Sequence, residues 1–218
     1  MRTARFFCDT INQNGAVTIS DAQFRHVAKV LRLKQGDIVE LFDGKGTVAQ
    51  AIIEKIAKDC ALLKVQDKKI FDSENRRKII IAAGIAKAHK FELIVAKCTE
   101  LGIDRIMPVI FERTVKQADS EMSARRFEAI AVESAKQCGR IFLPVIDKPL
   151  SFEKALENLR TDFPKAKIIF GSLQENAGSI INFDFGADVI AFIGPEGGLT
   201  EAEENQLEKV DAKPVRLT

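Results

Sequence analysis

The pattern of apolar and polar positions divides the chain into two parts that meet near residue 70. In the first part, short apolar runs at residues 38–42, 47–56 and 61–65 are separated by glycine-containing turns, such as the one at residues 43–46. Short β runs joined by turns of this kind are typical of small barrels and sandwiches. We therefore predict a small β domain at the amino-terminal end.

The second part follows a polar segment, residues 66–78, which we interpret as a linker. Strands are predicted at residues 79–83, 105–110, 166–170 and 188–193, and helices at residues 90–101, 120–138, 151–159 and 200–210. Gly102 and Gly139 are predicted to end two of these helices. Apolar strands that alternate with amphipathic helices predict an open, mostly parallel sheet with helices on both faces. Ligands bind such sheets at the carboxyl ends of the strands.

Composition and charge narrow the class of protein. Of the 218 residues, 46% are hydrophobic and 29% are charged, which is the balance of an ordinary globular protein. No run approaches the roughly 18 apolar residues that a membrane helix needs, and the N-terminus lacks the apolar region of a secretory signal. The four cysteines and two histidines are scattered without a C-x-x-C motif, which argues against a zinc site or a disulfide framework. We expect a cytoplasmic protein without a metal or a membrane span.

Charge alone does not identify a partner, because the net charge is only +2. One glycine-rich loop carries the candidate chemistry instead. The stretch I-G-P-E-G-G-L-T-E-A-E, residues 193–203, reads as a strand end, a loop and the start of a helix at the capping box Thr200-x-x-Glu203.

This loop lacks the lysine of a phosphate-binding loop and the G-x-G-x-x-G of a dinucleotide fold, and the Glu196 carboxylate would repel a polyphosphate. A ligand with an adenosine and a positive centre, such as S-adenosylmethionine, fits it better. The alternative is a tight strand–helix turn without a ligand, and the spacing alone leaves both interpretations open.

Further motifs extend over nearly the whole chain. They are K-C-T-E-L-G-I at residues 97–103, E-R-T-V at 112–115, E-x-x-K-Q-C-G-R at 133–140 and H-x-x-x-V-L-R-x-x-x-G-D at 26–37, followed by L-F-D-G at 41–44. Together with the glycine loop, they resemble the motifs of the RsmE family, the 16S ribosomal RNA (uracil-N3)-methyltransferases of the SPOUT superfamily.

The resemblance implies a PUA-like RNA-binding β-barrel over residues 1–70 and a SPOUT α/β methyltransferase domain with a trefoil knot over residues 74–218. It also implies a homodimer that binds S-adenosylmethionine in the knot and methylates N3 of one uridine in the 16S ribosomal RNA of the small ribosomal subunit. A further motif, roughly L-G-x-R-I-L-R-x-E-T-A, and a last helix are expected after Thr218. The resemblance therefore predicts that this 218-residue chain lacks one wall of the cofactor pocket.

Candidate site residues follow from the resemblance. The predicted cofactor residues are Gly171, Leu173, Ile193, Gly194, Pro195, Glu196, Gly197, Gly198 and Leu199. For Ile193 and Leu199, an ordinary place in the core is an equally good interpretation. Methylation at uridine N3 releases a proton, so Glu196 is predicted to accept it and Arg140 to stabilise the uracil anion. Cys138 lies on the apolar face of its helix and is predicted to be a core residue.

Basic residues are the candidates for RNA contact. A helix is predicted to begin at the capping box Ser20-x-x-Gln23 and to present Phe24 and Leu31 on its apolar face, with a row of basic residues opposite. The predicted RNA-binding residues are Arg25, His26, Lys29 and Arg32 of this helix, and Lys87, Lys90, Arg113 and Lys136 of the second part. Contact with phosphates is the functional interpretation of the row, and a solvated helix face is the alternative.

Three functions are compatible with these motifs. The first is the uridine methyltransferase described above. The second is a non-catalytic RNA-binding or ribosome-assembly factor with the same fold, which the three glycines of the loop disfavour. The third is a related methyltransferase that modifies another RNA or another position, and only mapping of the modified nucleotide separates it from the first.

Overall fold

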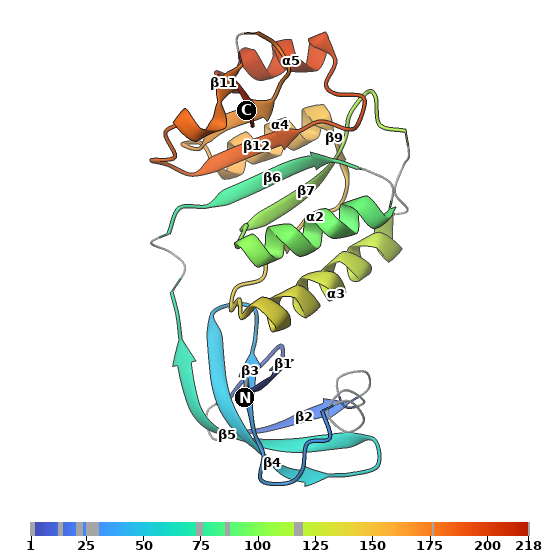
Figure 1. Ribbon diagram of the computed structural model, residues 1–218, viewed down its shortest axis with the longest axis vertical. Coiled ribbons are helices and arrows are strands. Elements are labelled where there is room, and N and C mark those ends of the chain that lie inside the picture. The colour runs from blue at the N-terminus through green and yellow to red at the C-terminus, as the bar shows by residue number, and fades with distance from the viewer. Residues whose placement is uncertain are drawn as a thin grey trace. The chain divides into compact units, whose positions relative to one another are not determined.

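The computed structural model describes residues 3–12, 15–20, 24, 31–72, 76–85, 88–115, 120–175 and 177–217. The chain divides into two compact units, Met1–Asn75 with Ala135–Leu143 and Arg76–Ser134 with Pro144–Thr218 (Figure 1).

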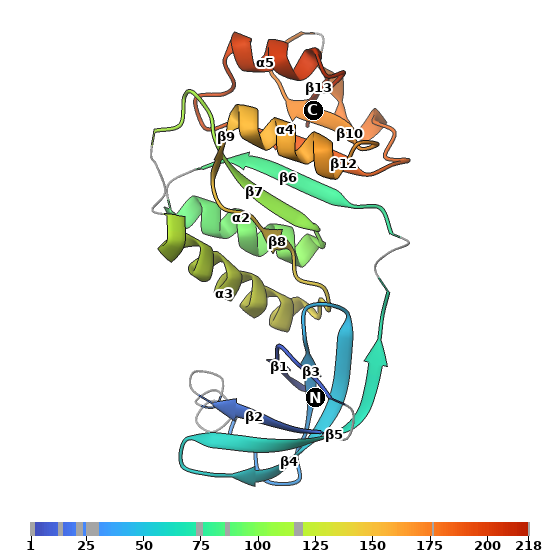
Figure 2. The same ribbon diagram turned by 180° about the vertical axis from the view of Figure 1, so that it is seen from behind.

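The first unit is built on a five-stranded sheet in the order β1-β3-β4-β5-β2. Its strands are β1 (Ala4–Phe7), β2 (Ala16–Ser20), β3 (Ile38–Phe42), β4 (Thr47–Ile56) and β5 (Cys60–Ile70). The pair β1–β3 is parallel and the others are antiparallel. The long strands β4 and β5 bend strongly (Figure 2), and their pairing contains two register shifts of the kind that increases twist. One face of the curled sheet therefore encloses a core that includes Phe6, Leu41, Ile53 and Leu63.

The predicted linker begins too early, and the prediction is wrong for residues 66–70. These residues continue β5, which ends at Ile70. They pair with the first half of β4, from Gln50↔Asp67 to Thr47↔Ile70. Their side chains are mostly exposed, so the polar composition that suggested a linker reflects a strand whose side chains face water while β4 satisfies its backbone.

The second unit is an eight-stranded sheet in the order β11-β13-β10-β12-β6-β7-β8, and β9 also pairs with β7. Its strands are β6 (Ile79–Gly84), β7 (Arg105–Ile110), β8 (Val145–Ile146), β9 (Leu150–Ser151), β10 (Lys167–Gly171), β11 (Gly178–Ser179), β12 (Val189–Ile193) and β13 (Lys213–Arg216). All the pairings between these described strands are parallel, which confirms the predicted parallel sheet. The trefoil knot stays a prediction.

Helices cover both faces of this sheet, as predicted (Figures 1 and 2). On one side lie α2 (Ala88–Leu101) and α3 (Ser120–Cys138), which pack together through Phe91 and Phe127 with ring centroids 5.0 Å apart. On the other side lie α4 (Phe152–Asp162) and α5 (Glu201–Glu208). Their buried side chains, Phe152, Leu159 and Leu207 among them, join Ile80, Phe170 and Phe192 of the sheet in the main core.

Local signals set the limits of the helices. Gly102 and Gly139 follow α2 and α3 with φ of +84° and +85°, the left-handed conformation that ends a helix at glycine. The predicted capping box of α5 is present, because the Thr200 N–H donates to Glu203 Oε2 at 2.8 Å and the Glu203 N–H donates to Thr200 Oγ1 at 3.3 Å. The helix predicted near residues 20–31 lies almost entirely outside the described residues, although Phe24 is buried.

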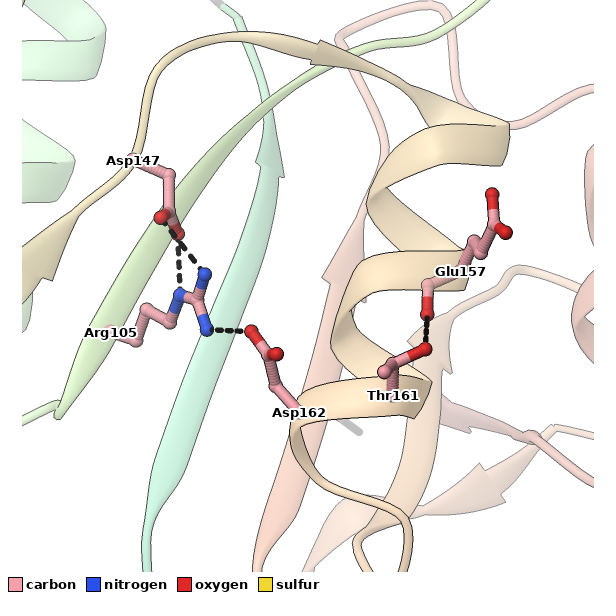
Figure 3. A network of polar contacts seen from close by, with 5 residues as sticks. All are labelled: Arg105, Asp147, Glu157, Thr161 and Asp162. Carbon is pink, nitrogen blue, oxygen red and sulfur yellow. Dashed lines mark hydrogen bonds and ion pairs between the residues drawn. The ribbon is translucent and has the colours of Figure 1, made fainter.

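A charged cluster fastens β7 to the segment before α4 and to the last residue of α4 (Figure 3). The guanidinium of Arg105 donates to both carboxylate oxygens of Asp147, at 2.6 and 3.0 Å, and to Asp162 Oδ2 at 2.5 Å. The hydrogen bond to Asp147 raises the pKa of Arg105 most, and Asp162 adds to the rise. Because the Arg105 side chain is only 20% exposed, the cluster is partly shielded from water.

We expect Arg105→Ala to lower the free energy of unfolding by about 2–3 kcal/mol, since it leaves the shielded carboxylate of Asp147, whose side chain is 17% exposed, without its cation. Urea unfolding followed by circular dichroism measures this change. The control is Lys97→Ala, which removes an exposed ion pair to Glu100 at 2.8 Å and is expected to change stability by less than about 1 kcal/mol. Equal effects of the two substitutions would contradict the role assigned to the Arg105 cluster.

Candidate active site

The carboxyl ends of four neighbouring strands meet at one edge of the parallel sheet. The register pairs Ala83 of β6 with Ile193 of β12, and Gly171 of β10 with Val215 of β13. The loops that follow these strands therefore start side by side, which is where α/β sheets bind ligands. They include both loops in which cofactor residues are predicted.

A cavity of about 530 Å³ opens at this edge. Of the predicted cofactor residues, those that line it are Gly171, Leu173, Ile193, Gly194, Pro195, Gly198 and Leu199. Ser172, which lies in the same predicted loop between Gly171 and Leu173, also lines the cavity. The lining residues that the motifs did not indicate are Ile81, Ile169, Ile180, Ala191, Val215, Arg216 and Leu217. The size and the mainly apolar lining are those of a small-molecule site.

The residues missed by the sequence analysis come mostly from the strands themselves. Ile169, Ala191 and Val215 form a small buried cluster, whereas their neighbours Ile168, Ile190 and Phe192 belong to the main core. Successive strand residues point to opposite faces, so Ile169 and Gly171 of β10 and Ala191 and Ile193 of β12 share the face that lines the cavity. If one lining residue of each strand had been known, the alternation of side chains along the strand would have identified the others.

Backbone packing explains the glycines around the loop. A Cβ atom on Gly84, at the end of β6, would lie 2.7 Å from Pro195 N, so β6 and the loop after β12 approach as closely as two backbones can. Gly198 has φ of +71°, and its N–H donates to the Pro195 carbonyl at 2.8 Å, which closes a tight turn. Gly194 and Gly198 both line the cavity, and neither places a side chain in it.

The side chains of Arg113 and Glu203 form hydrogen bonds with backbone groups of the glycine loop and of the residues next to it. Arg113 Nη1 donates to the carbonyls of Gly197 and Leu199, at 2.9 and 3.1 Å. The carboxylate of Glu203 is 5% exposed and bridges two backbone N–H groups, that of Glu112 at 2.8 Å through Oε1 and that of Thr200 at 2.8 Å through Oε2. The loop is thus tied to the segment that follows β7.

The Glu196 carboxylate lies on the same loop but does not line the cavity, and neither does Gly197. Lys90 of α2 donates to Glu196 Oε1 at 2.8 Å, and more than half of each side chain is exposed. The Glu196 carboxylate is therefore paired with Lys90 and still exposed to solvent.

The other predicted residues are distributed over both units. Lys136 and Arg140 lie in Ala135–Leu143, which belongs to the first unit, whereas Glu196 belongs to the second. The segment after Arg140 pairs with the glycine turn of the first unit, where the Leu143 N–H donates to the Gly44 carbonyl at 2.8 Å. Arg32 is exposed. Arg25, His26, Lys29 and Lys87 lie outside the described residues.

The cysteines do not form a nucleophilic site. Cys138 is exposed, so its predicted place in the core is wrong. It is the last residue of α3, and there a side chain escapes the packing that the helix period predicts farther from the end. Burial raises the pKa of Cys98 to about 11, which keeps this thiol protonated.

The described residues show neither a metal-binding cluster nor a helix suited to a membrane. They contain no group of three or more histidine, cysteine, aspartate or glutamate side chains placed to hold a metal ion. No helix in the same part of the chain has the length and apolar character needed to cross a bilayer.

Comparisons with known proteins match both parts of the chain. A family described as "RNA methyltransferase domain" matches residues 73–218, and one described as "RNA methyltransferase PUA domain" matches residues 19–66. Ribosomal RNA small subunit methyltransferase E of Bacillus subtilis (strain 168) is 28% identical over 213 residues, which cover 92% of this chain and 82% of that protein.

The protein of the same name from Mesomycoplasma hyopneumoniae (strain 232) is 27% identical over 217 residues, covering 98% of this chain and 90% of that protein. Among solved structures, the ribosomal RNA small subunit methyltransferase E of Neisseria gonorrhoeae, bound to S-adenosyl methionine, superposes with a TM-score of 0.88. It is 25% identical, and the match covers 100% of this chain and 90% of that chain. Because the domain profiles, the relatives and the superposed structure agree, this chain belongs to the RsmE family of RNA methyltransferases.

Proposed function

We propose that this protein transfers a methyl group from S-adenosylmethionine to N3 of a uridine in the 16S ribosomal RNA of the small ribosomal subunit. The observation that carries the proposal is the apolar cavity between the two predicted cofactor loops, at the carboxyl edge of the parallel sheet. Family membership supports the reaction class, and the relatives named for the small-subunit RNA support the substrate.

The cavity fits S-adenosylmethionine in size and in chemistry. About 530 Å³ is within the range of cofactor sites, and Ile193, Leu199 and Leu173 offer apolar surface for an adenine. Gly194 and Gly198 line the cavity without side chains, so a ribose could approach the backbone there. When bound, S-adenosylmethionine supplies an electrophilic methyl group on a sulfonium.

The protein's part in catalysis is to align the uracil and to remove its N3 proton. We assign proton acceptance to Glu196, whose carboxylate is exposed on the glycine loop and oriented by Lys90. The assignment of Arg140 to stabilisation of the uracil anion stays a prediction. Arg113 fits better as an anchor of the loop than as an RNA contact, since its guanidinium donates to two loop carbonyls.

We further propose that residues 1–70 form an RNA-binding PUA-like domain and residues 74–218 form the methyltransferase domain. The PUA-domain match at residues 19–66 and the methyltransferase match at residues 73–218 support these functions. Basic residues of the first domain would contact phosphates, which carry most of the affinity for RNA. A cytoplasmic location follows from the proposed substrate. The homodimer stays a prediction, which light scattering of the purified protein would check.

The test combines cofactor binding with mapping of the product. Calorimetry measures binding of S-adenosylmethionine to the purified chain, and incubation with small subunits that lack the modification measures methyl transfer. A methyl group on N3 blocks Watson–Crick pairing, so reverse transcription is expected to stop next to one uridine. Binding without methylation of any nucleotide would overturn the enzymatic proposal. Methylation at another position would favour the related-methyltransferase alternative.

A further inference from the structure

The loop after β10, which forms one wall of the cavity, is held by a side chain of α5. Ser172 is buried, and its hydroxyl donates to Glu204 Oε1 at 3.2 Å. The same hydroxyl accepts the Gln174 N–H at 3.2 Å, and Gln174 Nε2 donates to the other oxygen of the Glu204 carboxylate. One carboxylate therefore contacts both polar side chains that flank Leu173.

Hydrophobic packing does not hold residues 172–174 in place. The side chain of Leu173 is fully exposed, although it lines the cavity. Apolar burial therefore contributes little to the position of residues 172–174. Besides the Glu204 contacts, the loop is joined to β13 by the Ser172 N–H, which donates to the Val215 carbonyl at 3.0 Å.

Glu204 is adjacent to Glu203, which braces the other loop. The Glu203 carboxylate bridges Thr200 and Glu112, so the first turn of α5 is tied to the glycine loop and to the end of β7. Two consecutive carboxylates thus hold the two walls of one cavity.

We propose that Glu204 is a positioning residue for the cofactor, which fixes Ser172 and Gln174 so that Gly171 and Leu173 form a preorganised wall of the pocket. This inference rests on the proposed function, because it takes S-adenosylmethionine as the ligand. A loop already held in the binding conformation loses less conformational freedom when the ligand binds, which favours affinity.

The test compares Glu204→Ala with Glu201→Ala. Glu201 lies in the same first turn of α5 and is exposed, so its removal takes away the same charge near the same helix N-terminus. We expect Glu204→Ala to weaken S-adenosylmethionine binding about five- to tenfold in calorimetry, the loss expected for hydrogen bonds to a charged group. Glu201→Ala is expected to leave the Kd within about twofold of the parent protein.

Two further measurements separate positioning from general stability. Amide hydrogen exchange of residues 171–175 in the ligand-free protein is expected to speed up in Glu204→Ala and to stay unchanged in Glu201→Ala. Glu204→Gln retains an oxygen for Ser172 and is expected to restore most of the affinity. Equal Kd values for the two alanine variants, or faster exchange spread over the whole second unit, would overturn the proposal.

The two proposals fail in different ways. If the parent protein itself does not bind S-adenosylmethionine, the proposed function is overturned. The exchange of residues 171–175 still decides whether Glu204 holds the loop. If the parent protein binds and Glu204→Ala binds equally well, only the positioning role of Glu204 is overturned.

Discussion

Replacing Gly84 with alanine is expected to weaken S-adenosylmethionine binding about 100-fold. The added Cβ would lie 2.7 Å from Pro195 N, 3.0 Å from Pro195 Cα and 3.1 Å from Gly194 C. These neighbours are backbone atoms, so no side-chain rotation can relieve the overlap. The loop must move away from β6, and the cavity that it lines must change shape.

Calorimetry of the variant with S-adenosylmethionine measures the loss, and urea unfolding shows whether the second unit remains folded. Gly178→Ala is the matched control, because a Cβ at Gly178 of β11 meets no atom within 4 Å. It is expected to bind with the Kd of the parent protein. A folded Gly84→Ala variant with unchanged affinity would show that the position of Pro195 does not matter for the ligand.

The sequence could predict several features of the fold, but not the different roles of Gly84 and Gly178. Continuous apolar runs predicted the long strands of the second unit because both faces of a parallel sheet are buried. The predicted limits of α3, Ser120 and Cys138, agree with the structure because a glycine with positive φ ends the helix. Both signals are local. The need for glycine at position 84 comes from a loop more than a hundred residues later, and no local pattern contains it.

The same reasoning explains what was missed at the site. Glu203 was identified as a capping residue, but its bond to the Glu112 N–H depends on the loop after β7. The bonds from the Arg113 guanidinium to two loop carbonyls depend on a loop more than eighty residues later, and its contact with RNA stays a prediction. The two-residue strands β8, β9 and β11 have almost no pattern of their own and exist through pairing with a longer neighbour. Each of these features depends on contacts between residues that lie far apart in the sequence.

Replacing Glu196 with glutamine is expected to lower the rate of methyl transfer about 100-fold, the usual contribution of a positioned general base. Glutamine keeps the shape of the side chain and an oxygen that can accept from Lys90, but it cannot take up the N3 proton. Because Glu196 does not line the cavity, the Kd for S-adenosylmethionine is expected to stay within about threefold of the parent value. The two quantities come from single-turnover methylation of small subunits and from calorimetry.

The pH dependence of the methylation rate distinguishes the loss of a catalytic base from a misplaced substrate. If Glu196 accepts the proton, the residual rate of the glutamine variant rises with pH, because hydroxide replaces the lost carboxylate. A variant that only binds RNA poorly shows a higher KM and no such gain. Glu100→Gln is the control, since Glu100 forms an exposed ion pair with Lys97 at 2.8 Å and is expected to leave the rate unchanged. A full rate for Glu196→Gln would place the base elsewhere and leave the Lys90–Glu196 pair with a role in shaping the loop alone.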